Sequence, residues 1–263
     1  MTAIGIIIYM NIKAPRYVVD LLVEIVNGFK ELLQIELVGI YLHGSLAMGS
    51  FNPKSSDVDI LVVTTHKVSL AKKEQMASLM LKLSQKAPPK GIELSVVTQE
   101  AVEHFQHPTP FEFHFSSAWL ERFKNHQVDL IADRTDGDLA AHFTIVKARG
   151  LTLYGEPIND LFLGIPEKYY RDSIIEDAKG ILGDMSSNPV YSVLNLCRVR
   201  AFIEDGIITS KQEGGEWALA RTQGEDQKII EQALAEYKDE NKTEWDSDAL
   251  MRFGQRMSAF IFQ

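Results

Sequence analysis

Residues 38–63 read VGIYLHGSLAMGSFNPKSSDVDILVV, and this stretch decides the fold of the first half of the chain. Its first apolar run predicts a strand that ends at Gly44 and Ser45. Gly44 allows the backbone to turn sharply and to approach a ligand closely, and the helix predicted from Ser45 offers free N–H groups to an anion. The stretch closes with a β-branched run, a second predicted strand, which carries Asp57 and Asp59.

Asp57 and Asp59 occupy alternate positions of this predicted strand, so their side chains leave it on the same face. Two adjacent carboxylates repel each other unless a cation lies between them. Magnesium prefers oxygen ligands, often one or two carboxylates together with substrate phosphates. Asp-x-Asp by itself also fits a solvent-facing edge strand, but with Gly44 and Ser45 upstream it indicates a metal–nucleotide site.

Glu93 lies in a third predicted strand, residues 91–97 (GIELSVV), on the face opposite to the apolar side chains. An exposed strand position would explain this residue. The alternative is a third carboxylate beside Asp57 and Asp59. A hydroxyl that attacks a phosphate is a weak nucleophile at neutral pH, and a carboxylate that takes its proton contributes typically ~10²–10⁴-fold to the rate. Glu93 is therefore the candidate general base.

The composition is that of an ordinary globular protein: 45% of the 263 residues are hydrophobic and 24% are charged. The single cysteine, Cys197, excludes an internal disulfide and fits a reducing cytoplasm. The net charge of −9 disfavours a nucleic-acid binder and suits a cationic small substrate, although solubility alone would also explain it. The apolar run at residues 5–10 is too short for a membrane span, lacks signal-peptide features, and is either an extra strand or an unstructured lead.

Helical and strand patterns divide the chain into two predicted domains. Residues 1–160 alternate between the two kinds of pattern, which predicts an α/β (α+β) domain with a mixed sheet. Strand signals cease at about residue 161, which predicts an all-α helical bundle over residues 161–263. Helices are predicted at 169–183, 190–204, 210–220, 225–237 and 246–262.

Two cations of the predicted bundle are unusually placed. Arg198 lies in a mostly apolar helix, where a charge needs a partner, and Lys211 lies at a predicted helix start, where the helix dipole disfavours a cation. A nearby anion such as a triphosphate would explain both, as would ordinary surface ion pairs. Asp138, which precedes a helix predicted at residues 139–147, fits an N-cap.

The Gly44-Ser45 turn followed by Asp57-x-Asp59 resembles the signature of the nucleotidyltransferase superfamily that includes DNA polymerase β. Over most of its length the chain is similar to the aminoglycoside (3″)(9)-O-nucleotidyltransferase family, the spectinomycin/streptomycin adenylyltransferases. The similar runs are YLHGS at 41–45, SDVDILV at 56–62, ELSVV at 93–97, DGDLA at 136–140, LCR at 196–198, GIITSK at 206–211 and EWA at 216–218. The Gly-x-x-Thr-Ser-Lys element is specific to this family rather than general to the superfamily.

This resemblance implies an enzyme of two domains, with its site between them, that transfers AMP from ATP to a hydroxyl of an aminoglycoside or aminocyclitol antibiotic and confers resistance. It implies that Asp57, Asp59 and Glu93 hold Mg²⁺, with two ions expected, and that Glu93 is also the catalytic base. The implied nucleotide-binding residues are Gly44, Ser45, Ser56, Asp138, Arg198, Lys211 and Tyr237, and the implied acceptor-binding residues are Glu112, Trp119, Asp184 and Asn188.

The chain departs from the family pattern at two points. Family members that accept both drugs carry a tryptophan in the first helix of the second domain, and residues 171–188 contain none. An acidic residue just before the Arg198 helix is replaced by Asn188, although Asp184 is near in sequence. Both departures favour spectinomycin, modified at position 9, over streptomycin, modified at position 3″. The expected partners are ATP and a cationic antibiotic, with no nucleic acid and no membrane, and we expect a cytoplasmic monomer.

Three other functions are compatible with parts of this pattern. The first is a transferase whose acceptor is another small molecule or a protein, so that drug resistance is incidental. A nucleotide-binding sensor that has lost catalysis should lack a carboxylate, yet Asp57, Asp59 and Glu93 are all present. Antitoxin-like nucleotidyltransferase modules are usually single small domains, which fits this chain poorly.

Overall fold

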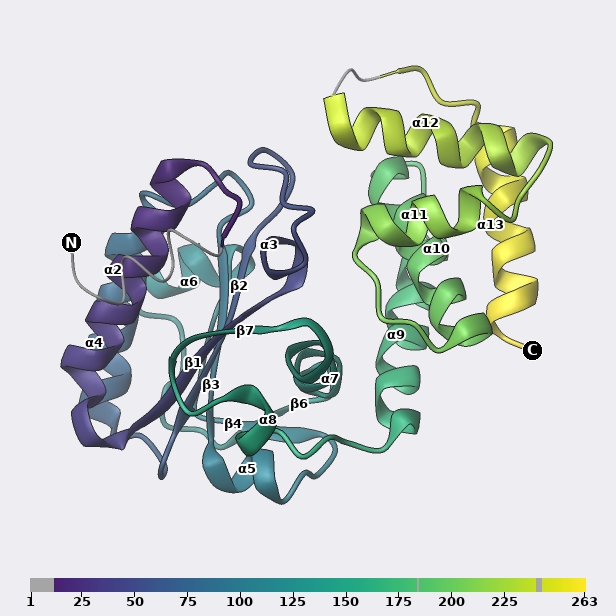
Figure 1. Cartoon of the computed structure of the whole chain (residues 1–263). Coiled ribbons are helices and arrows are strands. Elements are labelled where there is room, and N and C mark those ends of the chain that lie inside the picture. The colour runs from purple at the N-terminus through teal and green to yellow at the C-terminus, as the bar shows by residue number, and fades with distance from the viewer. Residues whose placement is uncertain (1–11, 184, 240–242) are drawn as a thin grey trace. The chain divides into compact units, whose positions relative to one another are not determined.

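The computed structural model describes residues 12–183, 185–239 and 243–263, and the chain forms two compact units, Met1–Ile165 and Pro166–Gln263. The expected extra strand or lead at residues 5–10 lies outside the described residues. No helix in the described part of the chain is both long enough and apolar enough to cross a membrane. Figure 1 labels the elements of both units.

The first unit contains a mixed sheet, as the sequence predicts. Among the described residues, its strands run in the order β5-β3-β2-β1-β7, with β2 and β3 parallel and the other neighbouring pairs antiparallel. A separate antiparallel pair is formed by β4 and β6. The strands are β1 Leu37–His43, β2 Val58–Thr64, β3 Ile92–Thr98, β4 Thr109–Phe111, β5 Phe113–Phe115, β6 Arg134–Asp136 and β7 Leu151–Gly155.

Helices cover both faces of this sheet (Figure 1). Strand side chains such as Ile60 pack into one core with α2 and α4, while Leu61 and the other alternate residues pack into a second core with α7 and α8. This burial on both sides explains why β2 reads as a continuous apolar run. The helices are α2 Arg16–Leu33, α3 Gly44–Ala47, α4 Leu70–Ser84, α5 Gln99–Glu103, α6 Leu120–Lys124, α7 Leu139–Arg149 and α8 Ile158–Leu161, with 3-10 turns at Gln34–Glu36 and Ser117–Trp119.

The second unit is helical throughout its described elements, which confirms the predicted bundle. Helix α10 packs against each of the other four. A capping box between Ser210 and Glu213 starts α11 and satisfies backbone N–H groups at its first turn. The helices are α9 Glu167–Leu182, α10 Pro189–Asp205, α11 Lys211–Leu219, α12 Glu225–Asp239 and α13 Ser247–Ile261.

Candidate active site

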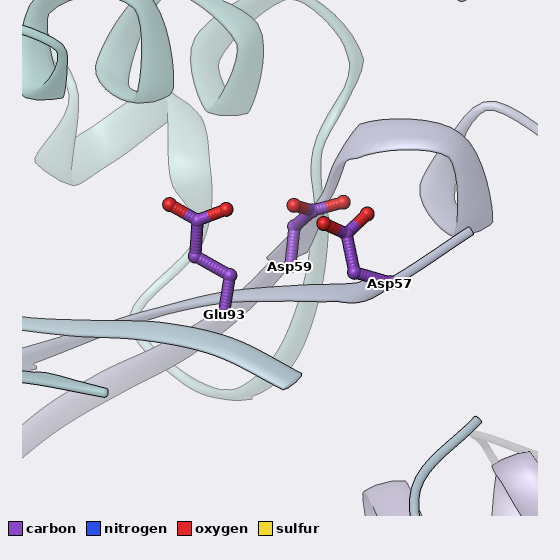
Figure 2. A group of neighbouring side chains, drawn as sticks. All are labelled: Asp57, Asp59 and Glu93. Atoms are coloured by element: carbon purple, nitrogen blue, oxygen red, sulfur yellow. The ribbon is translucent and has the colours of Figure 1, made fainter. Parts of the chain in front are cut away.

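Three carboxylates of the first unit converge at one end of the sheet. Asp57 immediately precedes β2, Asp59 lies in β2, and Glu93 is the register partner of Asp59 on the parallel strand β3. One oxygen of each carboxylate lies within 4.8 Å of the others. Figure 2 shows all three side chains pointing to the same side of the strands. The parallel register explains the convergence, because it sets Asp59 and Glu93 side by side on one face.

The turn after β1 lies directly against this group. Gly44 has φ +63, in the left-handed region that glycine adopts without strain, and a Cβ at this position would overlap the carboxylate of Asp59. The hydroxyl of the following residue, Ser45, is buried and has no hydrogen-bond partner in the part of the chain that the structure describes. The turn therefore needs glycine for two independent reasons, its backbone conformation and its contact with Asp59.

Ser56 is buried at the other end of the loop that leads to Asp57. Its hydroxyl accepts a hydrogen bond from the Asn52 N–H, 3.1 Å away, and the Ser56 N–H donates to the Asn52 carbonyl at 2.8 Å. These bonds close the turn-rich segment that the sequence predicts before β2. The predicted role of Ser56 in nucleotide binding stays a prediction, and its visible role is to hold this loop.

His142 on α7 joins the carboxylates, and sequence reasoning missed it. Its Nε2 lies 3.9 Å from Glu93 Oε1 and 3.4 Å from Asp138 Oδ2. Burial alone would lower the pKa of His142, but the hydrogen bond to Asp138 and the charges of Glu93, Asp138 and Asp59 together raise it to about 9. The imidazole is therefore positively charged at neutral pH and partly neutralises the acidic group around it.

Asp138 is at the N-cap position of α7, but its side chain makes no capping hydrogen bond. Asp138 therefore has the predicted N-cap position but not the expected capping hydrogen bond, because its carboxylate is turned toward His142 instead. Asp138 and His142 are four residues apart and so share one face of α7. That spacing, next to a predicted helix start, was the signal in the sequence that would have found His142.

His43, the last residue of β1, is the second histidine that sequence reasoning missed. Its ring centroid lies 4.8 Å from that of His142, and the residue is the register partner of Asp59. Burial and the neighbouring His142 charge hold the pKa of His43 well below its ordinary value, against an opposing effect of Asp138. His43 is therefore neutral, and its ring lies beside the charged imidazole of His142.

The cluster of three carboxylates, Asp57, Asp59 and Glu93, fits a divalent cation. Burial raises the pKa of Glu93; His142 opposes that rise, and the charges of Asp57, Asp138 and Asp136 add to it. A bound cation would relieve this repulsion, and an all-oxygen ligand set suits Mg²⁺. The absence of a side chain at Gly44 lets the Asp59 carboxylate pack closely against the turn. Asp57, Asp59 and Glu93 are thus the residues able to hold a metal ion.

The two cations predicted to bind a triphosphate, Arg198 and Lys211, lie on neighbouring helices of the second unit. Arg198 on α10 has Nη2 3.9 Å from Asp177 Oδ2, and its buried Nε has no hydrogen-bond partner among the described residues. Lys211 is the first residue of α11, and its Nζ lies 4.7 Å from the centroid of the Tyr191 ring. Both cations therefore have protein neighbours, and their predicted role with a triphosphate stays a prediction.

The remaining predicted residues of the second unit are dispersed. Tyr237 is buried on α12. Asn188 is at the N-cap position of α10 without a side-chain capping bond, and its carbonyl accepts from the Ser192 hydroxyl at 2.9 Å. Asp184 lies outside the described residues. Their predicted contacts with nucleotide or acceptor stay predictions.

Glu112 and Trp119, both predicted to face the acceptor, differ in their surroundings. The Glu112 carboxylate is buried, pairs with Lys73 Nζ at 3.2 Å and accepts from the Val68 N–H at 3.0 Å. Both contacts are made by Oε2, so one carboxylate oxygen of Glu112 is already bound within the protein. The Trp119 ring lies 4.7 Å from the Arg122 guanidinium and helps to line a pocket. The pocket is lined by Phe111, Glu112, Phe113, His114, Trp119, Val128, Asp129, Leu130, Ala132 and Arg134.

Comparison with known proteins defines the class to which this fold and site belong. A family model described as "Nucleotidyltransferase domain" matches residues 22–135, and one described as "Aminoglycoside adenylyltransferase, C-terminal domain" matches residues 160–259. The crystal structure of spectinomycin adenyltransferase AAD(9) from Enterococcus faecalis, solved with ATP and spectinomycin, shares the fold, with a TM-score of 0.78 and 21% identity over 93% of this chain and 99% of that chain. The chain is a two-part nucleotidyltransferase.

Curated relatives identify the family more closely. A spectinomycin 9-adenylyltransferase of Staphylococcus aureus is 27% identical over 246 residues, which is 90% of each chain. An aminoglycoside (3″)(9) adenylyltransferase of Escherichia coli is 24% identical over 88% of this chain and 89% of its own. The chain is an aminoglycoside nucleotidyltransferase, and over most of its length it is similar to the aminoglycoside (3″)(9)-O-nucleotidyltransferases, as the sequence motifs predict.

Proposed function

We propose that this enzyme transfers the AMP group of ATP to the 9-hydroxyl of spectinomycin, in a Mg²⁺-dependent reaction that confers resistance to the drug. The observation that carries the proposal is the convergence of the Asp57, Asp59 and Glu93 carboxylates within 4.8 Å. Relatives named spectinomycin 9-adenylyltransferase, in Staphylococcus aureus and in Enterococcus faecalis, support the choice of reaction and acceptor.

Asp57, Asp59 and Glu93 would hold the metal, with two ions expected. When bound, Mg²⁺ supplies positive charge that stabilises the phosphates and the leaving group during transfer. The protein contributes a rigid set of oxygen ligands, since two of the three come from paired strands. Ser45, Ser56, Asp138 and Tyr237 would complete the nucleotide site together with the Gly44 turn.

The chemical step needs a base, cations and a leaving group. Glu93 takes the proton of the acceptor hydroxyl as its oxygen bonds to the α-phosphorus of ATP. The bond between that phosphorus and the bridging oxygen of the β-phosphate breaks, and pyrophosphate leaves with the bonding electrons. Arg198 and Lys211 would neutralise the charge of the phosphates, and the proton remains on Glu93 until it passes to solvent.

Streptomycin is the less favoured acceptor for this chain. Residues 171–188 contain no tryptophan, and Asn188 stands where an acidic residue would help to bind a cationic drug. Trp119 and Asp184 stay predicted acceptor contacts, and the Glu112 carboxylate has Lys73 as a partner within the protein. We therefore expect adenylylation of spectinomycin and little of streptomycin.

A second candidate function keeps the transferase chemistry and changes the acceptor to another small molecule or a protein. One observation favours it. The Arg122 and Arg134 guanidinium groups lie 4.7 and 5.2 Å from the Trp119 ring, and a cationic drug at this ring would meet two like charges.

The two candidates are separated by incubating the purified enzyme with ATP and Mg²⁺ and with one acceptor at a time. The products are measured by mass spectrometry and by pyrophosphate release. We expect spectinomycin to gain one adenylyl group and streptomycin to stay largely unmodified. In EDTA, both the mass shift of spectinomycin and the release of pyrophosphate should vanish. Absence of any adenylylated spectinomycin, with pyrophosphate release on another acceptor, would favour the second candidate instead.

A further inference from the structure

Asp177 on α9 is the centre of a polar cluster in the second unit. Its Oδ2 accepts a hydrogen bond from Asn195 Nδ2 at 2.5 Å, and its Oδ1 accepts one from the Tyr191 hydroxyl at 3.4 Å. Arg198 Nη2 lies 3.9 Å from the same Oδ2. Asn195, Tyr191 and Arg198 all belong to α10, so this carboxylate connects α9 with the helix that carries one of the two cations.

The second cation is connected to the same carboxylate through Tyr191. The Lys211 ammonium lies 4.7 Å from the Tyr191 ring, while the hydroxyl of that ring bonds to Asp177. Lys211 can reach α10 because α11 runs very close to it. A Cβ on Gly214 would lie only 2.8 Å from the Arg198 Cα, so glycine permits this approach. Asp177 therefore contacts one cation directly and the other through a single aromatic side chain.

The Asp177 carboxylate orients the Arg198 guanidinium without taking a hydrogen bond from its N–H groups. At 3.9 Å, Nη2 is beyond hydrogen-bond distance from Asp177. The buried Nε has no hydrogen-bond partner in the described part of the chain, and a buried donor left in this state is energetically unfavourable. A guanidinium that is held in place with open donors is suited to bind an anion through two parallel hydrogen bonds.

We propose that Asp177 is a positioning residue, which holds Arg198 and Lys211 in the arrangement that binds the phosphates of the nucleotide. This inference rests on the proposed function, in which those two cations bind the phosphates. Rigid placement of a binding group lowers the entropy lost when the ligand binds. Removing the carboxylate therefore weakens nucleotide binding, even though it also removes a negative charge near a negative ligand.

The test measures the Kd of a non-hydrolysable ATP analogue with Mg²⁺, without acceptor, by calorimetric titration of the full chain. The variants are Asp177→Ala, Arg198→Ala and the double variant. The matched control is Glu176→Ala, which removes the adjacent acid of α9, paired only with the exposed Lys179 in the described structure. We expect about a tenfold rise in Kd for Asp177→Ala and none for Glu176→Ala. Adding Asp177→Ala to Arg198→Ala should raise the Kd by clearly less than tenfold, because only the effect through Lys211 then remains.

Two results would overturn the inference. A tighter Kd for Asp177→Ala would show that the carboxylate competes with the nucleotide, and an unchanged Kd would leave it a structural role alone. If circular dichroism shows that Asp177→Ala is unfolded, Asp177→Asn, which keeps the shape and loses the charge, is expected to weaken binding in the same direction. If Arg198→Ala binds the analogue with the wild-type Kd, the proposed role of Arg198 fails, and the positioning role of Asp177 fails with it. If Arg198→Ala weakens binding but Asp177→Ala leaves the Kd unchanged, the positioning role fails and the proposed function stands.

Discussion

Glu93 has a partly buried side chain, and in the proposed function it both holds the metal and takes the proton of the acceptor. The Glu93→Gln variant keeps the size of the side chain but cannot accept a proton from the acceptor. We expect kcat for spectinomycin adenylylation to fall by about 10²–10⁴-fold, the usual contribution of a general base. Steady-state pyrophosphate release measures it, with a thermal melt as the folding control. A variant that works at the wild-type rate would remove Glu93 from the role of base.

His142 makes the stability of the metal-free protein depend on pH. Its folded pKa is about 9, above the ordinary value of 6.5, so its contribution is fully present below pH 6.5 and is lost as the pH rises to about 9. The loss is at most about 3 kcal/mol, because one pKa unit corresponds to about 1.36 kcal/mol.

This pH dependence can be followed by urea unfolding in EDTA between pH 6 and pH 9.5. The wild type is expected to lose stability across that range, and His142→Gln, which cannot gain the charge, is expected to show a shallower slope. Equal slopes for the two proteins would mean that the imidazole is not charged in the folded state.

At the scale of elements, one buried ion pair fixes α4 to the segment between β4 and β5. Lys73 on α4 and Glu112 have side chains that are only 11% and 9% exposed. Lys73→Met leaves the carboxylate buried without its counter-charge, which costs about 3–5 kcal/mol. Urea unfolding should show this loss, and the added change Glu112→Gln should recover most of it.

Lys72 on the same helix provides the matched control. Its ion pair with Glu36 is more exposed, at 27% and 41%, so Lys72→Met is expected to cost less than about 1 kcal/mol. Equal losses for the Lys72 and Lys73 variants would contradict the special role assigned to the buried pair.

The elements of the site were predictable from the sequence because their signals are local. The alternation around Asp57 and Asp59 and the isolated Glu93 predicted strands that β2 and β3 confirm. The position of His142 beside Glu93 was not predictable in this way, because it depends on how α7 packs against the sheet. The cluster around Asp177 is a similar case, since its members come from different helices.

The partner of Glu112 within the protein could not be predicted from the sequence. A family resemblance can assign a position to a ligand without saying what surrounds the side chain. The carboxylate of Glu112 is bound by Lys73, which lies thirty-nine positions away in the sequence, on α4. Such a pair has no local periodicity, so only the tertiary structure reveals it.

At the scale of the whole molecule, the net charge of −9 should speed and strengthen the encounter with a cationic acceptor. Added salt screens this attraction, since the Debye length falls from about 30 Å at 0.01 M to about 3 Å at 1 M. We expect the KM for spectinomycin to rise several-fold over this range while kcat changes little. A KM that does not depend on salt would show that the overall charge serves solubility alone.

In the proposed function, the three carboxylates hold the metal through which the nucleotide binds. The most direct test is the Kd of a non-hydrolysable ATP analogue, measured by titration calorimetry with Mg²⁺ and with EDTA, for wild type and Asp59→Asn. We expect Mg²⁺ to tighten binding to the wild type strongly and to have little effect on the variant. Full enhancement by Mg²⁺ in Asp59→Asn would contradict it.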